Sequence, residues 1–248
     1  MLTISVALRC LARCGCINAA ISTRGMQEIG LLFALEPAIA ALYPPGRERR
    51  EALLRHAGHS NTHPYMMPLY LGIALSLETQ VAGGSLPAAA VGGVSRTLST
   101  TLSALGDGFF EGAVLPCWSL ACVIFVLCGQ VWAAIVLTAL LVAVMIVFRV
   151  GMFFYGLRYG VAALHWLKRL ALIDWAGRIK QANAVLLALL LGVTPWAEHS
   201  FPWLLCVPAL LCATAAAVFA GRMRLPRIIL WLIGVSCLAF LDAALVRG

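Results

Sequence analysis

Side chains able to bind a polar ligand are concentrated in one short stretch of this sequence, Asn61-Thr62-His63. Amide, hydroxyl and imidazole groups can each donate and accept hydrogen bonds, which recognition of a hydroxyl-rich ligand requires. Pro64 follows at once and favours a break beside an apolar segment, the arrangement in which discontinuous membrane helices form binding sites. We therefore expect Asn61, Thr62 and His63 to contact a ligand. The alternative is a turn in which Asn61 or Thr62 caps the next helix.

Two carboxylates beside apolar runs are candidates for the same site. Asp107 lies at the edge of a long apolar run, and Glu78 closes a shorter one. A carboxylate in such a position is costly unless it is paired or hydrated, so we expect a functional role for both. For Asp107 the alternative is an N-cap of a helix over 112–128. We expect Glu111 to lie at the level of the lipid headgroups.

A metal site is considered because His56, His59 and His63 are spaced i, i+3, i+7, on one face of a helix. Such a face could hold zinc. However, Pro64 disfavours the helical conformation at His63, and no carboxylate or cysteine beside the three histidines offers a fourth ligand. We predict no metal and no other cofactor. No nucleotide-binding loop, nucleophile elbow or zinc-protease helix occurs, so we predict no enzymatic activity.

The composition places these residues in a membrane protein. Of 248 residues, 62% are hydrophobic and 11% charged, against roughly 45–50% and about 25% in soluble domains. The excess apolar surface must face lipid or other membrane subunits. The net charge of +8 is read as a topology signal, because cytoplasmic loops collect Arg and Lys. A nucleic-acid partner is not expected, since no basic stripe interleaves with aromatic residues.

The predicted fold is an all-α polytopic membrane protein, one integrated domain in three parts. Residues 1–64 form amphipathic and cytoplasmic helices, with Pro37 expected to break one of them. Residues 65–111 form a re-entrant hairpin or broken helix followed by a Gly/Ser-rich segment, because the apolar stretch 65–78 is shorter than the ~20 residues that a crossing needs. Residues 112–248 form the transmembrane helical region.

The crossings follow from the apolar runs. The charge-free run 112–148 would reach about 55 Å as one helix, nearly twice the hydrocarbon core, so we predict two crossings joined near Gly129-Gln130. Three further runs, about 182–197, 201–221 and 228–246, bring the count to about five crossings. Arginines near 47–55, 168–180 and 222–227 mark the cytoplasmic side.

Five groups of residues, in order along the chain, carry a resemblance to a known family: Met26-Gln27 with Gly30; Pro37-Ala38-Ile39 with Leu42-Tyr43-Pro44; Arg55-His56 with Asn61-Thr62-His63-Pro64, Leu71-Gly72-Ile73 and Glu78; Gly106-Asp107 with Phe110, Gly112 and Pro116; and Gly156 with Tyr159-Gly160. The sequence resembles the IID membrane subunit of mannose/fructose/sorbose-family sugar permeases of the phosphotransferase system, over about residues 11–190.

This resemblance implies a subunit of the bacterial cytoplasmic membrane that pairs with a IIC subunit, in a trimer of such pairs. Together the two would move a hexose-type sugar inward through the lipid bilayer. Cytoplasmic IIA and IIB subunits would carry the phosphoryl group, and the IID chain itself would not be phosphorylated. The resemblance implies that the sugar contacts Asn61, Thr62, His63, Glu78 and Asp107. We expect Arg47, Arg50, Arg55 and His56 to form the cytoplasmic docking face.

The sequence also departs from the family pattern. His59-Ser60 replaces two aromatic residues, Thr79 replaces the second of two glutamates, and Glu111 stands where the family often has Trp. These departures favour an alternative function for this chain more strongly than the sequence of a standard family member would. The chain would then be a non-transporting membrane partner that docks IIB or another regulator at residues 47–60.

Overall fold

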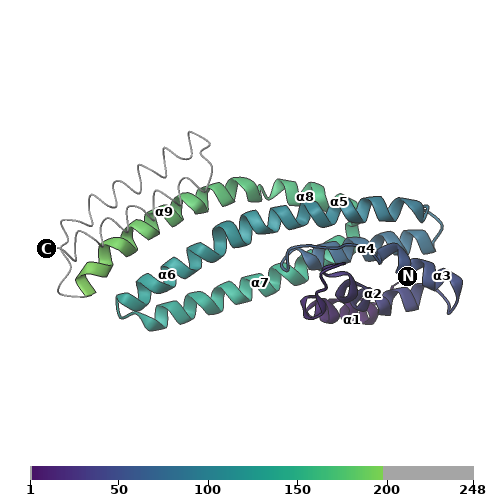
Figure 1. Cartoon of the computed structure of the whole chain (residues 1–248), viewed down its shortest axis with the longest axis horizontal. Helices are drawn as coiled ribbons and strands as arrows, with labels where there is room; N and C mark the ends of the chain where they lie inside the picture. The colour runs from purple at the N-terminus through teal and green to yellow at the C-terminus, as the bar shows by residue number, and fades with distance from the viewer. Residues whose placement is uncertain (1, 198–248) are drawn as a thin grey trace. The chain divides into compact units, whose positions relative to one another are not determined.

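The computed structural model describes residues 2–197, and among them it contains helices and no β-strand (Figure 1). Residues 2–183 belong to one compact unit, and a second unit begins at Ala184. The predicted runs at 201–221 and 228–246, and the arginines at 222–227, lie outside the described residues.

The described helices are α1 (Ile4–Cys14), α2 (Glu28–Leu42), α3 (Arg47–His56), α4 (Met67–Ala82), α5 (Ala89–Gly106), α6 (Leu115–Leu127), α7 (Val131–Tyr159), α8 (Ala163–Arg169) and α9 (Leu172–Ala197). There are also 3₁₀ turns at Ile17–Ala20 and Gly160–Ala162 and a π-helical segment at Asp107–Val114.

Helix α4 is the most buried element of the first unit. Its residues 69–75 are all buried, and Pro68 lies in its first turn, where the missing proline N–H removes no helix hydrogen bond. The predicted short apolar segment is thus one unbroken helix of 16 residues, about 24 Å long. It turns back into α5 through residues 83–88, with Gly84 at a φ of +74°. Of the two alternatives, the broken helix is wrong, because α4 is continuous from Met67 to Ala82. That the α4–α5 hairpin is re-entrant stays a prediction.

Two glycines bring α4 against α7. A Cβ on Gly72 would lie 2.2 Å from the carbonyl oxygen of Phe153, and a Cβ on Gly156 would lie 2.7 Å from that of Leu69. Small residues allow helix backbones to approach this closely, which is how membrane helices gain packing energy. The pair fixes α4, and the residues directly before it, against the long helix α7.

Helices α5, α6 and α7 carry the membrane character. The helical run Ala89–Leu127, which includes the π-helical segment, and the run Val131–Leu187 are long and apolar enough to cross a bilayer. Most of the α6 and α7 surface is apolar and exposed, including Val136, Leu140 and Val147. The turn predicted near Gly129-Gln130 is confirmed, because α6 ends at Leu127, α7 begins at Val131 and Gly129 has a φ of +75°.

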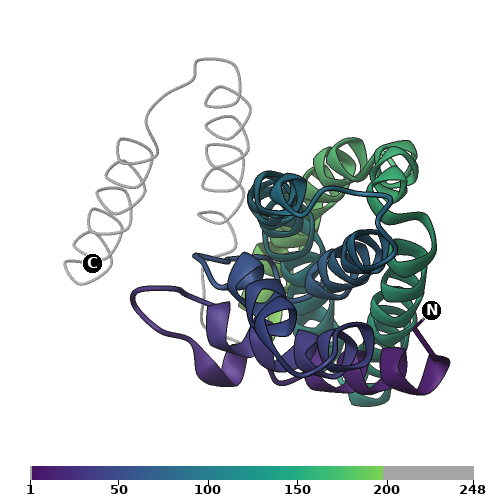
Figure 2. The same ribbon diagram turned by 90° about the vertical axis from the view of Figure 1, so that its right-hand side faces the viewer.

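The N-terminal helices α1 and α2 lie side by side and both contact the buried helix α4, while α3 packs on α2 (Figures 1 and 2). Helix α1 is amphipathic as expected, with Ala7, Cys10 and Cys14 buried on one face. The predicted break at Pro37 is wrong, since α2 continues through it. Proline removes the N–H that would bond the carbonyl of Phe33, and the guanidinium of Arg13 on α1 donates to that oxygen instead, at 3.1 Å. The Phe33 carbonyl therefore keeps a hydrogen-bond donor although the helix continues through Pro37.

Candidate functional site

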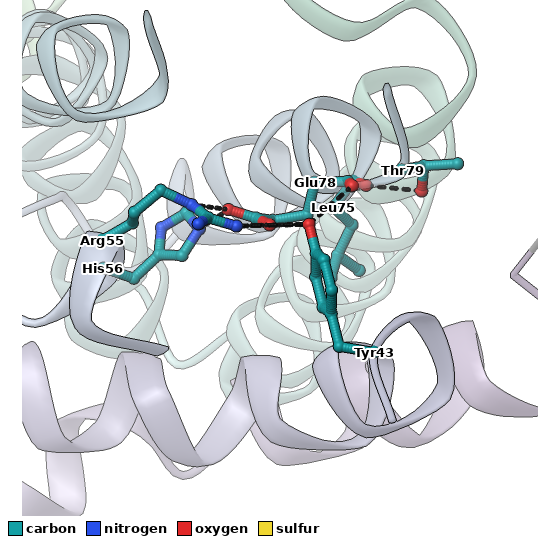
Figure 3. Close-up of polar contacts among 6 residues, drawn as sticks. All are labelled: Tyr43, Arg55, His56, Leu75, Glu78 and Thr79. Atoms are coloured by element: carbon teal, nitrogen blue, oxygen red, sulfur yellow. Dashed lines mark hydrogen bonds and ion pairs between the residues drawn. The ribbon is translucent and has the colours of Figure 1, made fainter. Parts of the chain in front are cut away.

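One group of predicted site residues surrounds Glu78 (Figure 3). The Glu78 side chain on α4 is fully buried, and its carboxylate accepts hydrogen bonds from three side chains. Arg55 Nη2 lies 2.7 Å from Oε2 and Arg55 Nε 3.1 Å from Oε1, while His56 Nε2 lies 2.9 Å from Oε1. The Tyr43 hydroxyl donates to Oε2 at 2.8 Å. Arg55 and His56 belong to α3, so the carboxylate joins α3 to α4.

The electrostatics of this group favour a permanently charged carboxylate. Burial alone would raise the pKa of Glu78, but hydrogen bonds from His56 and Arg55 outweigh it and lower the pKa to about 2. Burial and the neighbouring Glu78 raise the pKa of Tyr43 to about 12, so its hydroxyl stays protonated and donates. His56 donates through Nε2, and its buried Nδ1 has no hydrogen-bond partner. Such a saturated carboxylate has little capacity left for a ligand.

A second group forms around His63, in the segment that leads into α4. The imidazole is buried, stacks on Phe110 with ring centroids 5.3 Å apart at 17°, and lies beside Tyr65 at 5.5 Å. Its Nε2 points at Glu111, 3.6 Å from Oε1. Asp107 is close enough that one ligand atom from each of His63, Asp107 and Glu111 lies within 4.8 Å of the others. Both carboxylates are exposed and belong to the π-helical segment.

The backbone explains how His63 reaches these carboxylates. Gly106, the last residue of α5, lies directly under the imidazole, because a Cβ on it would be 2.3 Å from the His63 Cβ. Asp107 continues the helix from Gly106 and is not an N-cap, so the alternative role proposed for it does not apply. A π-helical turn inside an α-helix frequently marks a functional site.

The hydrogen bond at Nδ1 makes the neutral His63 ring a donor at Nε2. Its Nδ1 accepts the backbone N–H of Tyr65 at 3.2 Å, so in the neutral ring the proton is on Nε2, facing Glu111. Burial lowers the pKa of His63, against the opposite influence of Glu111 and Asp107. A metal ion at Nε2 would require the proton on Nδ1, where it would meet the Tyr65 N–H. The arrangement suits hydrogen bonding to a polar ligand better than metal coordination.

Asn61 and Thr62 are held by polar residues of other elements. Ser99 Oγ on α5 accepts from the Asn61 N–H at 3.1 Å and donates to its carbonyl at 3.0 Å. Thr62 is buried, with Oγ1 2.9 Å from Ser99 Oγ and its N–H donating to Gln27 Oε1 at 2.7 Å. Neither residue caps α4, which begins at Met67. The Asn61 side chain is left exposed.

The predicted docking residues divide into two sets. Arg47 pairs with Glu51 at 2.7 Å, the expected i, i+4 ion pair on an exposed face of α3, and Arg50 is also exposed. Arg55 and His56 instead face inward to Glu78. The predicted histidine row is likewise divided: His56 contacts Glu78, His63 contacts Glu111 and His59 is exposed.

A family model described as "PTS system mannose/fructose/sorbose family IID component" matches residues 2–190, which include both groups of residues. The chain belongs to this family. This IID chain is 30% identical over 136 residues to the fructose permease IID component of Bacillus subtilis (strain 168), with 54% of this chain and 48% of that protein covered. It is 39% identical over 93 residues to the mannose-specific EIID component of the PTS system in Escherichia coli (strain K12), with 37% of this chain and 33% of that protein covered. The matched part is thus half the length of these relatives or less.

Solved structures share the fold of this IID chain. One, described as the structure of a membrane protein, has a TM-score of 0.74 at 21% identity and covers 98% of this chain and 97% of its own. The cryo-EM structure of the mannose transporter ManYZ with microcin E492 has a TM-score of 0.57 at 23% identity, covering 100% and 98%. The IID chain is therefore a helical membrane component of a phosphotransferase system.

Sequence reasoning missed several residues that complete the two groups. In the sequence, Tyr43 and Gln27 stand out only as parts of family motifs, and Ser99 carries no distinguishing signal. Glu111 is expected at the level of the lipid headgroups, and its carboxylate also lies beside His63. The signal that could have located Glu111 is its i, i+4 spacing from Asp107, which puts both on one side of a helix.

Proposed function

We propose that this chain is the IID subunit of a sugar permease that translocates a hexose-type sugar across the inner membrane of a bacterium. A IIC subunit would form the rest of the pathway, in a trimer of IIC/IID pairs. IIA and IIB subunits would relay the phosphoryl group, and IIB would phosphorylate the sugar on arrival, without phosphorylation of the IID chain. The observation that carries the proposal is the family match over residues 2–190, which includes every predicted site residue.

We propose that Asn61, His63 and Asp107 face the sugar. His63 presents its Nε2–H to the carboxylate of Glu111. The Asp107 carboxylate is exposed near the middle of Ala89–Leu127, a helical run long enough to cross the bilayer. The ring of Tyr65 is partly exposed and offers a sugar an apolar face, whereas Phe110 is buried against it. For Thr62 and Glu78 the contacts favour a structural role, because their polar atoms are bonded within the protein.

We also propose a multi-pass arrangement with about five crossings. The two long apolar runs among the described residues support part of it. The exposed arginines Arg47 and Arg50 would face the cytoplasm, where the IIA/IIB subunits dock.

The test is to purify the chain with a co-expressed IIC subunit and titrate hexoses by calorimetry. We expect saturable binding of one hexose, lost in Asn61→Ala and Asp107→Asn and kept in Asp174→Asn, a control at an exposed carboxylate on α9. A stable complex that binds no hexose would refute the proposal and favour a role in docking a regulator at residues 47–60.

A further inference from the structure

We infer that the segment 158–178, at the end of the long apolar helix α7, binds the headgroup of an anionic phospholipid in the cytoplasmic leaflet. The inference concerns residues outside the groups around Glu78 and His63, and it does not depend on which sugar is carried. It follows from the position of the segment at the end of α7, from its partly exposed aromatic rings and from its exposed cations.

The length of α7 places this segment at a membrane surface. The helix has 29 residues and is about 44 Å long, which matches the roughly 40–45 Å of a bilayer with its headgroup regions. It ends at Tyr159, because Gly160 adopts a φ of +55° and the chain turns into the short helix α8. When one end of α7 lies at one surface of the bilayer, its other end, next to Arg158, lies at the headgroups of the opposite leaflet.

Aromatic rings gather at this end of α7. The ring centroid of Tyr155 lies 4.5 Å from that of Tyr159 and 4.8 Å from that of Trp166, which joins α8 to the last turns of α7. Tyr159 is exposed, and the other two rings are partly exposed. Tyr and Trp are enriched at membrane surfaces, since their rings are apolar and their O–H or N–H can reach the headgroups. The three rings therefore favour a position of α8 at headgroup level.

Helix α8 presents a basic face beside these rings. Its Ala163 and Leu167 are buried, whereas His165, Lys168 and Arg169, spaced i, i+3 and i+4, are exposed on the opposite face. Neither cation has a carboxylate oxygen within 4.0 Å in the described part of the chain. Both are therefore available to an anion from outside the chain.

The first turns of α9 extend the same combination of apolar and basic side chains. Ile173 and Trp175 are 76% and 51% exposed, and the guanidinium of Arg178 lies over the Trp175 ring, 5.2 Å from its centroid. Arg158 lies likewise over the ring of Tyr159, at 5.5 Å. In such a pair the apolar ring can enter the boundary of the acyl chains while the guanidinium meets a phosphate.

The charge of the segment favours an anionic lipid as the occupant. Residues 158–178 contain four Arg or Lys residues and one acidic residue, which gives a net charge of +3. Each Lys or Arg near an anionic membrane surface strengthens binding roughly fivefold. A soluble acidic protein would pair with the cations, but it would leave the exposed rings at headgroup level without an apolar neighbour. An anionic phospholipid satisfies both the cations and the rings.

The experiment measures lipid binding by native mass spectrometry to the full chain, purified in detergent with its co-expressed IIC subunit. The probe is dioleoyl phosphatidylglycerol, and dioleoyl phosphatidylcholine is the control with the same acyl chains and no net charge. We expect the anionic lipid to bind at least about tenfold tighter. Lys168→Gln with Arg169→Gln should abolish this preference. Arg24→Gln with Arg96→Gln, which removes two exposed cations elsewhere, should retain it.

A second measurement locates the lipid. In reconstituted bilayers, phosphatidylglycerol with brominated acyl chains should quench the tryptophan fluorescence more strongly than brominated phosphatidylcholine. Trp166→Phe with Trp175→Phe should remove that difference. A charge-conserving variant, Lys168→Arg with Arg169→Lys, should bind the anionic lipid as the wild type does.

Three results would overturn the inference and leave the permease function standing. The first is equal binding of the two lipids. The second is a preference for the anionic lipid that survives Lys168→Gln with Arg169→Gln, or that is lost in the charge-conserving variant. The third is capture of a IIB subunit that this Gln variant loses while it still binds the anionic lipid, which would assign the surface to protein docking.

Discussion

Glu78 and Asp107 are both carboxylates beside apolar helices, and their surroundings give them different roles. The Glu78 carboxylate is fully buried and bonded to Arg55, His56 and Tyr43. The Asp107 carboxylate is exposed, and its hydrogen-bond contact among the described residues is Ser103 Oγ at 3.5 Å. A buried charge that is fully bonded maintains a structure, whereas an exposed charge inside a membrane helix is available for a ligand.

Replacement of Glu78 should destabilise the protein. In Glu78→Gln the guanidinium of Arg55 loses its charge partner in a mostly buried position, which costs about 3 kcal/mol or more. Thermal unfolding of the purified protein in detergent would measure the loss. Glu51→Gln, at the exposed partner of Arg47, is the control and should leave the Tm unchanged.

The same carboxylate predicts an acid sensitivity. Because the folded protein lowers the pKa of Glu78 to about 2 from its ordinary value of 4.5, its stabilisation is complete above about pH 4.5. It should be lost as the pH falls from there toward 2. Unfolding measured between pH 7 and pH 3 should therefore show a decline in the wild type that is smaller in Glu78→Gln. Parallel declines in the two proteins would contradict the assignment.

Gly106 should be required for ligand binding through His63. A Cβ at this position would lie 2.3 Å and 2.4 Å from Cβ and Cγ of His63, so Gly106→Ala must displace the imidazole from Phe110 and Glu111. We expect at least about a tenfold loss of sugar affinity in the IIC/IID complex. Gly92→Ala, on the same helix with no atom within 4 Å of the added carbon, should bind normally.

The residues that form the site could be predicted only in part from the sequence. His63 and Asp107 were selected from their chemistry and neighbours, and the structure brings them together. Glu78 was grouped with them because it too ends an apolar run. Its separation depends on how α3 packs against α4, a contact between elements that periodicity along the chain does not encode.

At the scale of the elements, the crossing of α4 and α7 depends on two glycines. Gly72→Ala would place a carbon 2.2 Å from the Phe153 carbonyl oxygen, so the helices must move apart. Such overpacking typically costs about 1–3 kcal/mol. The midpoint of thermal unfolding should fall in Gly72→Ala and stay unchanged in Gly151→Ala, at a glycine of α7 with open space around it. Equal stability of the two variants would show that the backbone crossing is not tight.

The sequence predicted elements well where one local signal dominated. The turn between α6 and α7 was predicted from a charge-free run too long for one crossing, together with a glycine. The break predicted at Pro37 is wrong because Arg13, which lies 20 positions before Phe33, supplies the missing donor to the Phe33 carbonyl. Continuity from α5 to α6 was not anticipated, because its Gly- and Ser-rich sequence is typical of loops.

At the scale of the whole molecule, the charge distribution predicts which side each turn faces. The charged residues that flank the apolar run of the α6–α7 hairpin, Glu111 and Arg149, should be cytoplasmic, and its turn should therefore lie outside. In a variant that keeps only Cys128, which is exposed beside this turn, a membrane-impermeant maleimide should label intact cells. An Arg50→Cys variant in the same background should be labelled only after the cells are permeabilised. Labelling of Cys128 that also requires permeabilisation would mean that this hairpin does not cross the membrane.

The π-helical segment Asp107–Val114 also determines how the helix downstream is oriented. Each residue of an α-helix turns the chain by about 100°, so a change of one residue in this segment would rotate all of α6 relative to α5. Trp118, which donates to Thr138 of α7, would then leave its partner, and Asn183 would lose the Ala113 carbonyl that it bonds at 3.0 Å. Insertions and deletions should therefore be tolerated at the turn near Gly129, and in this segment they should be as damaging as the loss of a site residue.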